Sequence, residues 1–174
     1  RSYRHPELDR RIRRERTRRE ARLTSAARRA GVPTPLVRDV DVRETTLALQ
    51  YVGETDLDGA LSPETVRAVG RHLATIHDAG FVHGDPTTRN VRVGSAGSGG
   101  PDSVFLIDVG LGYHTGHEED HAMDLHVFAQ SLAGTADDPE RLAAAAEDAY
   151  REASQRGDTV IKRLRAIEGR GRYQ

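Results

Sequence analysis

Apolar residues recur every three or four positions in the first stretch of the chain, between charged ones. This spacing predicts one helix over residues 7–30 with a narrow apolar stripe. A glycine and two prolines within residues 31–35 end it. Residues 35–42 and 45–52 then alternate or run apolar around polar residues that can turn, which predicts a two-stranded hairpin.

Helical spacing returns at Pro63, which suits a first helical position after Ser62 as the cap, and Gly80 ends this second helix. Two short apolar strands follow, over residues 90–93 and 104–108, and a Gly-rich turn separates them. The last third of the chain predicts three helices, over residues 122–133, 139–155 and 158–168. The order helix, hairpin, helix, loop, hairpin, helices indicates an α+β fold.

Composition narrows the class of protein. The chain has 174 residues, 36% of them hydrophobic, which suffices for one domain with a real core. No apolar run reaches membrane-spanning length, so we expect no membrane association. The absence of cysteine excludes disulfides and thiol chemistry and fits a cytoplasmic protein. Because the net charge is −1, any contact with nucleic acid must come from local basic patches.

Three polar residues around the second hairpin carry the candidate chemistry. Antiparallel pairing of its strands would bring Asn90 and Asp108 to the same end, where an amide and a carboxylate can ligate Mg²⁺ through oxygen. Asp85, on the loop that enters the hairpin, can orient a hydroxyl or water and accept its proton. This division of roles matches phosphoryl transfer, whereas the alternative is two unrelated acidic loops.

The ordered motifs carry a more specific resemblance. "HGDPTTRN" and "LIDVGLG" are similar to the catalytic loop and metal-binding segment of the protein-kinase fold. Together with "YRHPELDRRIRRERTRREARL", "EEDHAMDLHVF" and the closing "GRGRYQ", they resemble the small atypical kinase/ATPase subunit of the KEOPS complex, the PRPK family. The resemblance spans nearly the whole chain. It implies a protein-kinase-like fold, with a partial N-lobe over residues 1–52 and a small helical C-lobe with a basic tail over residues 53–174.

The resemblance also implies a function and partners. It indicates an ATP- and Mg²⁺-dependent Ser/Thr kinase or ATPase that supports threonylcarbamoyl-adenosine modification of tRNA. The expected partners are the sugar-kinase-like subunit that transfers the threonylcarbamoyl group, possibly fused upstream, the other KEOPS subunits, and tRNA.

Each motif position then receives a role by resemblance. Asp85 takes the catalytic position, Asn90 and Asp108 bind ATP and the metal, and Glu20 matches the helix acid that pairs with a phosphate-holding lysine. Without the resemblance, Glu20 would be a capping-box residue or a solvated charge. The remaining positions are the hinge that meets adenine, two structural residues, and a basic tail for tRNA or partner contact: Gln50, Tyr51 and Val52; His83 and Asp124; Arg170, Arg172 and Tyr173.

The chain also departs from the kinase pattern. No Gly-rich loop precedes the first helix and the only lysine is Lys162, so we expect the strands that cover ATP to lie upstream of a truncated N-terminus. The segment between Asp108 and Asp124 is short and lacks A-P-E, which argues against a broad-specificity protein kinase. An aminoglycoside- or choline-type phosphotransferase and a non-catalytic pseudokinase scaffold remain alternatives.

A histidine-rich segment offers a rival metal site. His114, His117 and His121 alternate with acids, but zinc sites usually use ligands on firm elements. We expect this segment to be a solvated polar loop instead.

Overall fold

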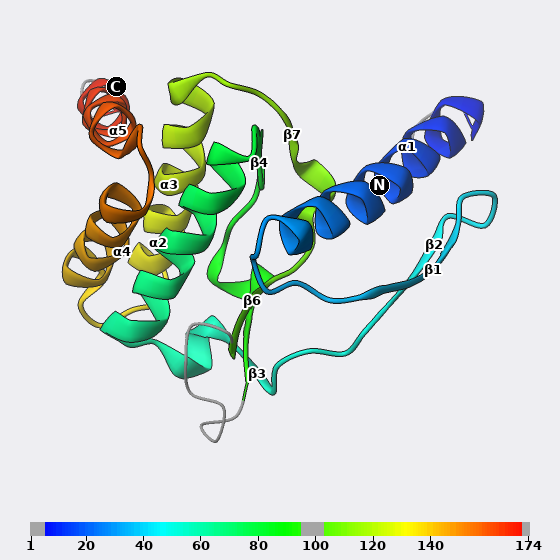
Figure 1. The fold of residues 1–174 in the computed structure, drawn as a ribbon, viewed down its shortest axis with the longest axis horizontal. Coiled ribbons are helices and arrows are strands. Elements are labelled where there is room, and N and C mark those ends of the chain that lie inside the picture. Colours follow the sequence, from blue (N-terminus) through cyan, green and yellow to red (C-terminus); the bar gives the residue numbers. More distant parts are fainter. Residues whose placement is uncertain (1–5, 95–102, 172–174) are drawn as a thin grey trace.

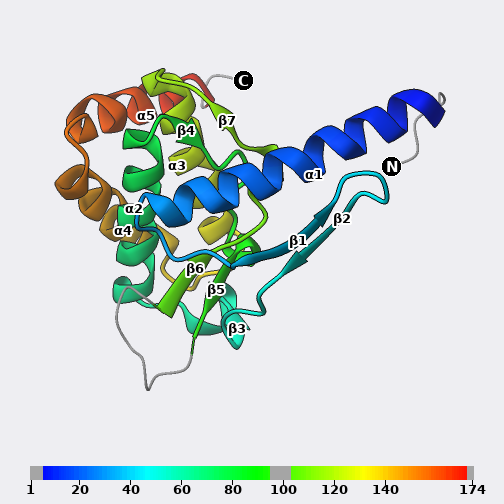
Figure 2. The same cartoon turned by 45° about the vertical axis from the view of Figure 1, so that its right-hand side comes forward.

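The computed structural model describes residues 6–94 and 103–171. A long helix, α1 (Pro6–Arg29), and a hairpin of β1 (Val37–Asp41) and β2 (Thr46–Leu49) extend side by side from a body of helices (Figures 1 and 2). The hairpin is antiparallel, as predicted, and pairs Val40 with Leu47. The expected lobe boundary at residue 52 falls just after this arm and stays a prediction.

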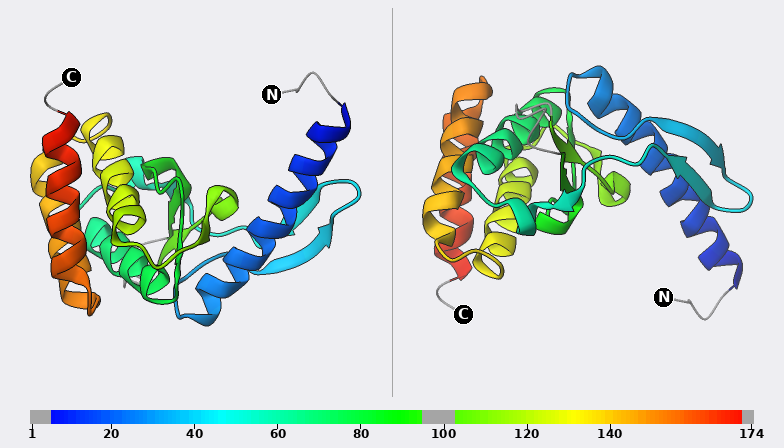
Figure 3. Two further views of the ribbon diagram at one scale, coloured as in Figure 1. Left: turned by 90° about the horizontal axis from the view of Figure 1, so that it is seen from above. Right: turned by 90° about the horizontal axis from the view of Figure 1, so that it is seen from below.

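Only the second half of α1 is packed into the protein. Leu23 and Ala27 are buried there, whereas Leu8, near the start of the helix, is 39% exposed. The buried half packs on a short 3-10 turn, η5 (Val109–Leu111), and the first turns project into solvent beside the hairpin (Figure 3). The apolar stripe expected over residues 7–30 is therefore a core face only near its end.

The body consists of four helices: α2 (Pro63–Asp78), α3 (Glu118–Ala133), α4 (Pro139–Ala153) and α5 (Gly157–Gly171). The predicted start of α2 is confirmed, because the Ser62 hydroxyl accepts from the Thr65 backbone N–H and the Thr65 hydroxyl accepts from the Ser62 N–H. α2 crosses α4 at very short range. A Cβ added to Gly70 would lie 2.1 Å from the carbonyl oxygen of Ala146.

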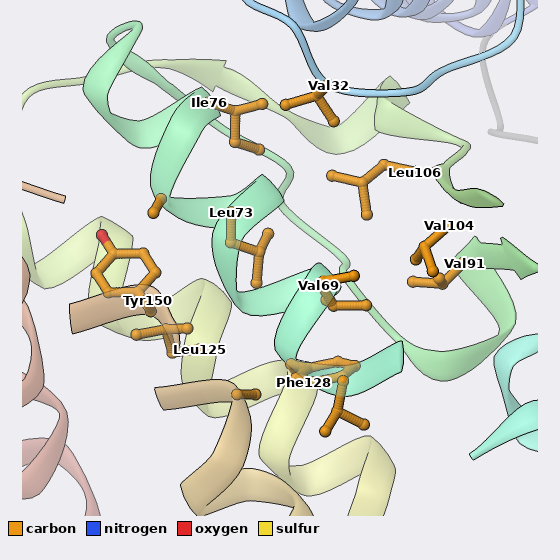
Figure 4. Packing of buried hydrophobic residues seen from close by; sticks show 14 of the residues in the cluster. Val32, Val69, Leu73, Ile76, Val91, Val104, Leu106, Leu125, Phe128 and Tyr150 are labelled. Atoms are coloured by element: carbon orange, nitrogen blue, oxygen red, sulfur yellow. The ribbon is translucent and has the colours of Figure 1, made fainter. Parts of the chain in front are cut away.

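The core lies between α2, α3, α4 and the second hairpin (Figure 4). Its burial of apolar side chains supplies the main driving force for folding this body. The labelled side chains come from the segment after α1, from α2, from the strands, and from α3 and α4: Val32; Val69, Leu73 and Ile76; Val91, Val104 and Leu106; Leu125, Phe128 and Tyr150.

A small antiparallel sheet holds the second hairpin. β5 (Val91–Val93) pairs with β6 (Val104–Leu106), as the sequence predicts, and with β3 (Thr55–Asp56) on its other side. β3 and the following 3-10 turn η1 (Leu57–Ala60) lie outside the elements that the sequence predicts. The reason is local burial, since Leu57 is wholly enclosed and fixes its neighbours against β5.

A second pair of short strands also lies outside the predicted set. β4 (Phe81–Val82), directly after α2, pairs antiparallel with β7 (Tyr113–His114).

α3 begins at Glu118 and not at the predicted residue 122, so part of the segment expected to be a histidine-rich loop is helical. Three acids in the first turn, Glu118, Glu119 and Asp120, favour a helix N-terminus. His121 is consequently helical and fully buried, with its ring stacked on that of His77 at 4.4 Å. The expectation of a solvated loop is wrong for this half of the segment.

Candidate active site

The β5–β6 hairpin brings two predicted ligands together. The Ile107 N–H donates to the Asn90 carbonyl at 3.0 Å, which continues the ladder by one pair and puts Asn90 beside the residue preceding Asp108. The prediction that both lie at the same end of the hairpin is confirmed. Asp108 has left-handed backbone angles, φ 54° and ψ 55°, at the point where β6 turns into η5, and its side chain is exposed.

Asn90 is tied to Asp85 through its amide nitrogen. Nδ2 donates to the Asp85 carbonyl at 2.8 Å and to its carboxylate Oδ2 at 3.1 Å. With the nitrogen so engaged, Oδ1 is the amide atom that can serve a hard cation. The structure therefore joins Asp85 and Asn90 directly and places Asp108 at the same hairpin end.

His83 connects this loop to the end of β6 from inside the protein. Its ring is fully buried, Nε2 donates to the Ile107 carbonyl at 3.0 Å, and Nδ1 accepts from the Asp85 N–H at 3.4 Å. Burial lowers the pKa of His83, against the opposing influence of Asp124, the Ile107 hydrogen bond, Asp85 and Asp108. A neutral ring with the proton on Nε2 satisfies both contacts.

Asp124 of α3 holds the same loop from the other side. Its carboxylate accepts from the His83 N–H at 2.6 Å, the Gly84 N–H at 2.9 Å and His77 Nε2 at 3.0 Å. Burial alone would raise the pKa of Asp124, but these hydrogen bonds and the neighbouring histidines hold it below its usual value.

Gly84 belongs to this arrangement for a steric reason. Its φ is +85°, and a Cβ there would lie 2.5 Å from the carbonyl oxygen of Leu111. Only glycine allows the loop to approach η5 so closely.

A pocket of about 640 Å³ opens between α1, the segment after β2, and the β5–β6 hairpin, and its lining includes Asp108 but neither Asp85 nor Asn90. Two acids lie at one end of it. An added Cβ at Gly110 would be 3.2 Å from Glu20 Oε2 and 3.4 Å from Asp108 Oδ1, so both carboxylates border the same space. Burial raises the pKa of Glu20, repulsion from Asp108 adds to this, and Arg16 opposes it. Positive charge is therefore favoured between these acids.

The expected hinge residues also line the pocket, but not as part of a strand. Gln50, Tyr51 and Val52 follow β2, which ends at Leu49, so the strand predicted over residues 45–52 ends three residues earlier than expected. Only the Gln50 N–H continues the pairing, by donating to the Leu36 carbonyl at 2.8 Å. The Tyr51 side chain is 81% exposed.

Three further polar residues line the pocket and were not expected there: Arg16, Asp56 and Arg92. Strand alternation could have identified Arg92, because it lies between two buried valines and must face the opposite side. Arg16 precedes Glu20 by one helical turn, which also indicates a shared face.

The remaining expected sites are separate from this pocket. Lys162 is an exposed residue of α5, and the charged neighbours of Glu20 are instead Arg16 of α1 and Asp108, which precedes η5. Arg170, also on α5, pairs with Glu119 at 2.9 Å. Arg172 and Tyr173 lie outside the described residues.

The donor set suits magnesium and not a closed protein cage. Within residues 6–94 and 103–171, no three His, Asp or Glu side chains gather as a metal cluster. An amide and one carboxylate are nevertheless a normal protein contribution to Mg²⁺, whose other ligands are water and substrate phosphates.

Among the helices of residues 6–94 and 103–171, none combines the length and the apolar character that a membrane span requires.

Comparison with known proteins gives no matching family model but many curated relatives. The chain is 68% identical over 174 residues to a protein of Haloarcula marismortui, 66% over 173 residues to one of Halobacterium salinarum, and 40% over 171 residues to one of Methanospirillum hungatei. All three are named probable bifunctional tRNA threonylcarbamoyladenosine biosynthesis proteins. The chain spans only 31–32% of their length.

A solved structure supports the fold. WaaP, in a complex with acyl carrier protein, matches 88% of this chain and 76% of its own with a TM-score of 0.63 and 16% identity. The chain thus has a kinase-like fold and is homologous to about one third of the bifunctional tRNA threonylcarbamoyladenosine biosynthesis proteins.

Proposed function

We propose that this chain binds ATP with Mg²⁺ and acts as an atypical Ser/Thr kinase or ATPase in threonylcarbamoyl-adenosine modification of tRNA. The observation that carries the proposal is the convergence of Asp85, Asn90 and Asp108 at one hairpin end, where Asp108 lines the pocket. The kinase-like fold and the names of the relatives support the same conclusion.

The residues divide the chemistry between them. Asn90 Oδ1 and the Asp108 carboxylate would hold Mg²⁺, which neutralises charge on the nucleotide phosphates. Asp85, fixed by Asn90 and His83, orients the acceptor hydroxyl or water and takes its proton as the terminal phosphoryl group transfers and ADP leaves. Glu20 stands beside Asp108, where it can pair with a cation that contacts the phosphates.

The wider role rests on the relatives. Their remaining two thirds would supply the sugar-kinase-like subunit that transfers the threonylcarbamoyl group, fused to this chain or bound to it among other KEOPS subunits in the cytoplasm. The basic tail with Arg170, Arg172 and Tyr173 would contact tRNA or that partner. Deleting residues 169–174 should weaken tRNA binding and reduce its salt dependence, because phosphate contacts release counterions. Binding that is unchanged across a salt series would remove the tail from this role.

The test uses the protein as its gene encodes it. Asp108→Ala should weaken Mg·ATP binding and lower phosphate release by about three orders of magnitude, since metal ligands contribute several kcal/mol. Asp85→Ala should abolish turnover but leave Mg·ATP affinity within about threefold of the wild type, because it contacts the acceptor. His117→Gln is the control, as His117 is exposed before α3.

The outcomes separate the rival functions. Normal turnover by Asp108→Ala would refute the assignment of this site. Mg·ATP binding without turnover in the wild type would instead indicate a pseudokinase scaffold, and turnover that requires an aminoglycoside or choline would indicate a small-molecule phosphotransferase.

A further inference from the structure

The middle residue of the strand β5 is an arginine, Arg92, that faces the pocket. Val91 and Val93 of β5 point into the core, with exposures of 0% and 7%, and Arg92 between them lines the pocket. Its side chain is 19% exposed, so most of the arginine is enclosed by protein.

The N–H groups of Arg92 are engaged by the segment that follows β2. Nη1 donates to Asp56 Oδ1 at 2.5 Å, Nη2 to the Tyr51 hydroxyl at 3.3 Å and to the Gly53 carbonyl at 3.4 Å, and Nε to the Val52 carbonyl at 3.4 Å. These contacts fix the plane of the guanidinium by its edge. Because these donors are engaged by protein, Arg92 can contact a ligand in the pocket only through the flat face of its guanidinium.

Charge gives the pocket two different ends. Glu20 and Asp108 border one end together with Arg16, and their carboxylates suit Mg²⁺, which would hold the phosphates there, whereas Arg92 at the other end is paired with Asp56. Arg92 pairs with Phe105 across the hairpin, and Asp108 lies three residues beyond Phe105, just after β6 ends at Leu106, so Phe105 and Asp108 are at most about 10 Å apart. A nucleotide whose phosphates lie at the acidic end is long enough to bring its base to Arg92.

We propose that the guanidinium of Arg92 is a stacking platform for the purine base of the nucleotide, held flat by Asp56 and the backbone of residues 52–53. This inference rests on the proposed function, since it assumes a nucleotide in this pocket. Arginine planes stack on nucleobases and are attracted to π-systems. The Tyr51 ring already lies in this relation to Arg92, with 5.8 Å between Cζ and the ring centroid.

The geometry also defines what the platform recognises. Because the Arg92 edge is engaged by protein, it stacks on any purine face and does not distinguish adenine from guanine by hydrogen bonds. Arg92 therefore contributes equally to ATP and GTP affinity and contributes nothing to a triphosphate that lacks a base.

The test is isothermal titration of the protein, as its gene encodes it, with Mg·ATP, Mg·GTP and Mg·tripolyphosphate. Arg92→Ala should weaken the affinity for both nucleotides by about tenfold, the range of one lost stacking contact. Its affinity for tripolyphosphate should stay within about twofold of the wild type. Arg92→Lys, which keeps the charge but not the plane, should resemble Arg92→Ala. Arg38→Ala, the same change at an exposed position of β1, should match the wild type.

Each other result overturns a defined part of the argument. An equal loss of tripolyphosphate affinity in Arg92→Ala would show a charge or folding effect, and full affinity in Arg92→Lys would show that charge alone suffices. Unchanged nucleotide affinity in Arg92→Ala would remove Arg92 from the site while leaving the proposed function intact. A wild-type protein that binds neither nucleotide would refute the proposed function and this inference with it.

Discussion

Replacing Asp124 should destabilise the protein strongly, although Asp124 lies outside the pocket lining. The carboxylate is 3% exposed and is the acceptor for two backbone N–H groups and one imidazole. Its pKa lies below the usual value, so at pH 7 the group is charged and its stabilising effect is fully present. That effect would be lost only as the pH falls through the folded-state pKa.

The magnitude follows from the three contacts. A hydrogen bond to a charged group contributes about 1.5–3 kcal/mol, and a buried donor left without a partner costs about 1–3 kcal/mol. Because the contacts share one carboxylate and are not additive, we expect Asp124→Ala to cost about 4 kcal/mol, within the range for breaking a buried ionic contact. Asp124→Asn keeps one acceptor but presents an N–H to a donor, and should cost about half as much.

The assay is urea unfolding at pH 7, followed by circular dichroism. With a slope of about 2 kcal/mol per molar urea, the midpoint should fall by about 2 M for Asp124→Ala and about 1 M for Asp124→Asn. Asp148→Asn is the matched control, because that acid is 57% exposed beside Arg151 and should change stability by less than about 0.5 kcal/mol. If Asp124→Ala unfolds at the same urea concentration as this control, the reasoning from the three hydrogen bonds is refuted.

Two further predictions concern the helical body. Burial, and then the neighbouring His77, lower the pKa of His121 to about 4. In the unfolded chain its pKa is near 6.5, so as the pH falls the unfolded state binds the proton first. The free energy of unfolding should therefore fall by about 3 kcal/mol between pH 7 and pH 4. Urea titrations across this range should show that the free energy of unfolding depends less on pH in His121→Phe than in the wild type. The exposed His117→Gln should follow the wild type. The same pH dependence in the wild type and both variants would contradict the assignment to His121. Gly70→Ala should cost at least about 2 kcal/mol, because its methyl group would overlap the Ala146 carbonyl. Gly169→Ala, on α5 where an added methyl group meets open space, should raise the free energy of unfolding by up to about 1 kcal/mol, measured by thermal unfolding. A similar change in stability for Gly70→Ala and Gly169→Ala would contradict the close α2–α4 crossing.

Periodicity predicted the long elements because each of them repeats a pattern many times. α1, α2 and α4 contain several turns of consistent spacing, and the Ser62 cap marks a start by its chemistry. The β5–β6 pairing followed from two apolar stretches around a turn, and it placed Asn90 and Asp108 correctly.

The elements that were missed depend on contacts far apart in the sequence. β3, β4 and β7 have two residues each, which is too short for any alternation to be visible. β4 and β7 pair only because α2 and the turn after Asp108 bring them together. His121 was misjudged for the same reason. Its polar neighbours in the sequence suggested a loop, but His121 is buried by stacking on His77, and that contact depends on how α2 packs on α3.

The candidate site divides between half-buried or exposed groups that would do chemistry and fully buried groups that fix them. Asp108 is exposed, whereas His83 behind it is fully buried and joins the Ile107 carbonyl to the Asp85 N–H. That link works only with a neutral ring, because a second proton on Nδ1 would face the Asp85 N–H donor. The burial that lowers the pKa of His83 therefore keeps the acceptor that holds Asp85 in place. A substitution that let water reach His83 would disturb the Asp85 loop without changing Asn90 or Asp108.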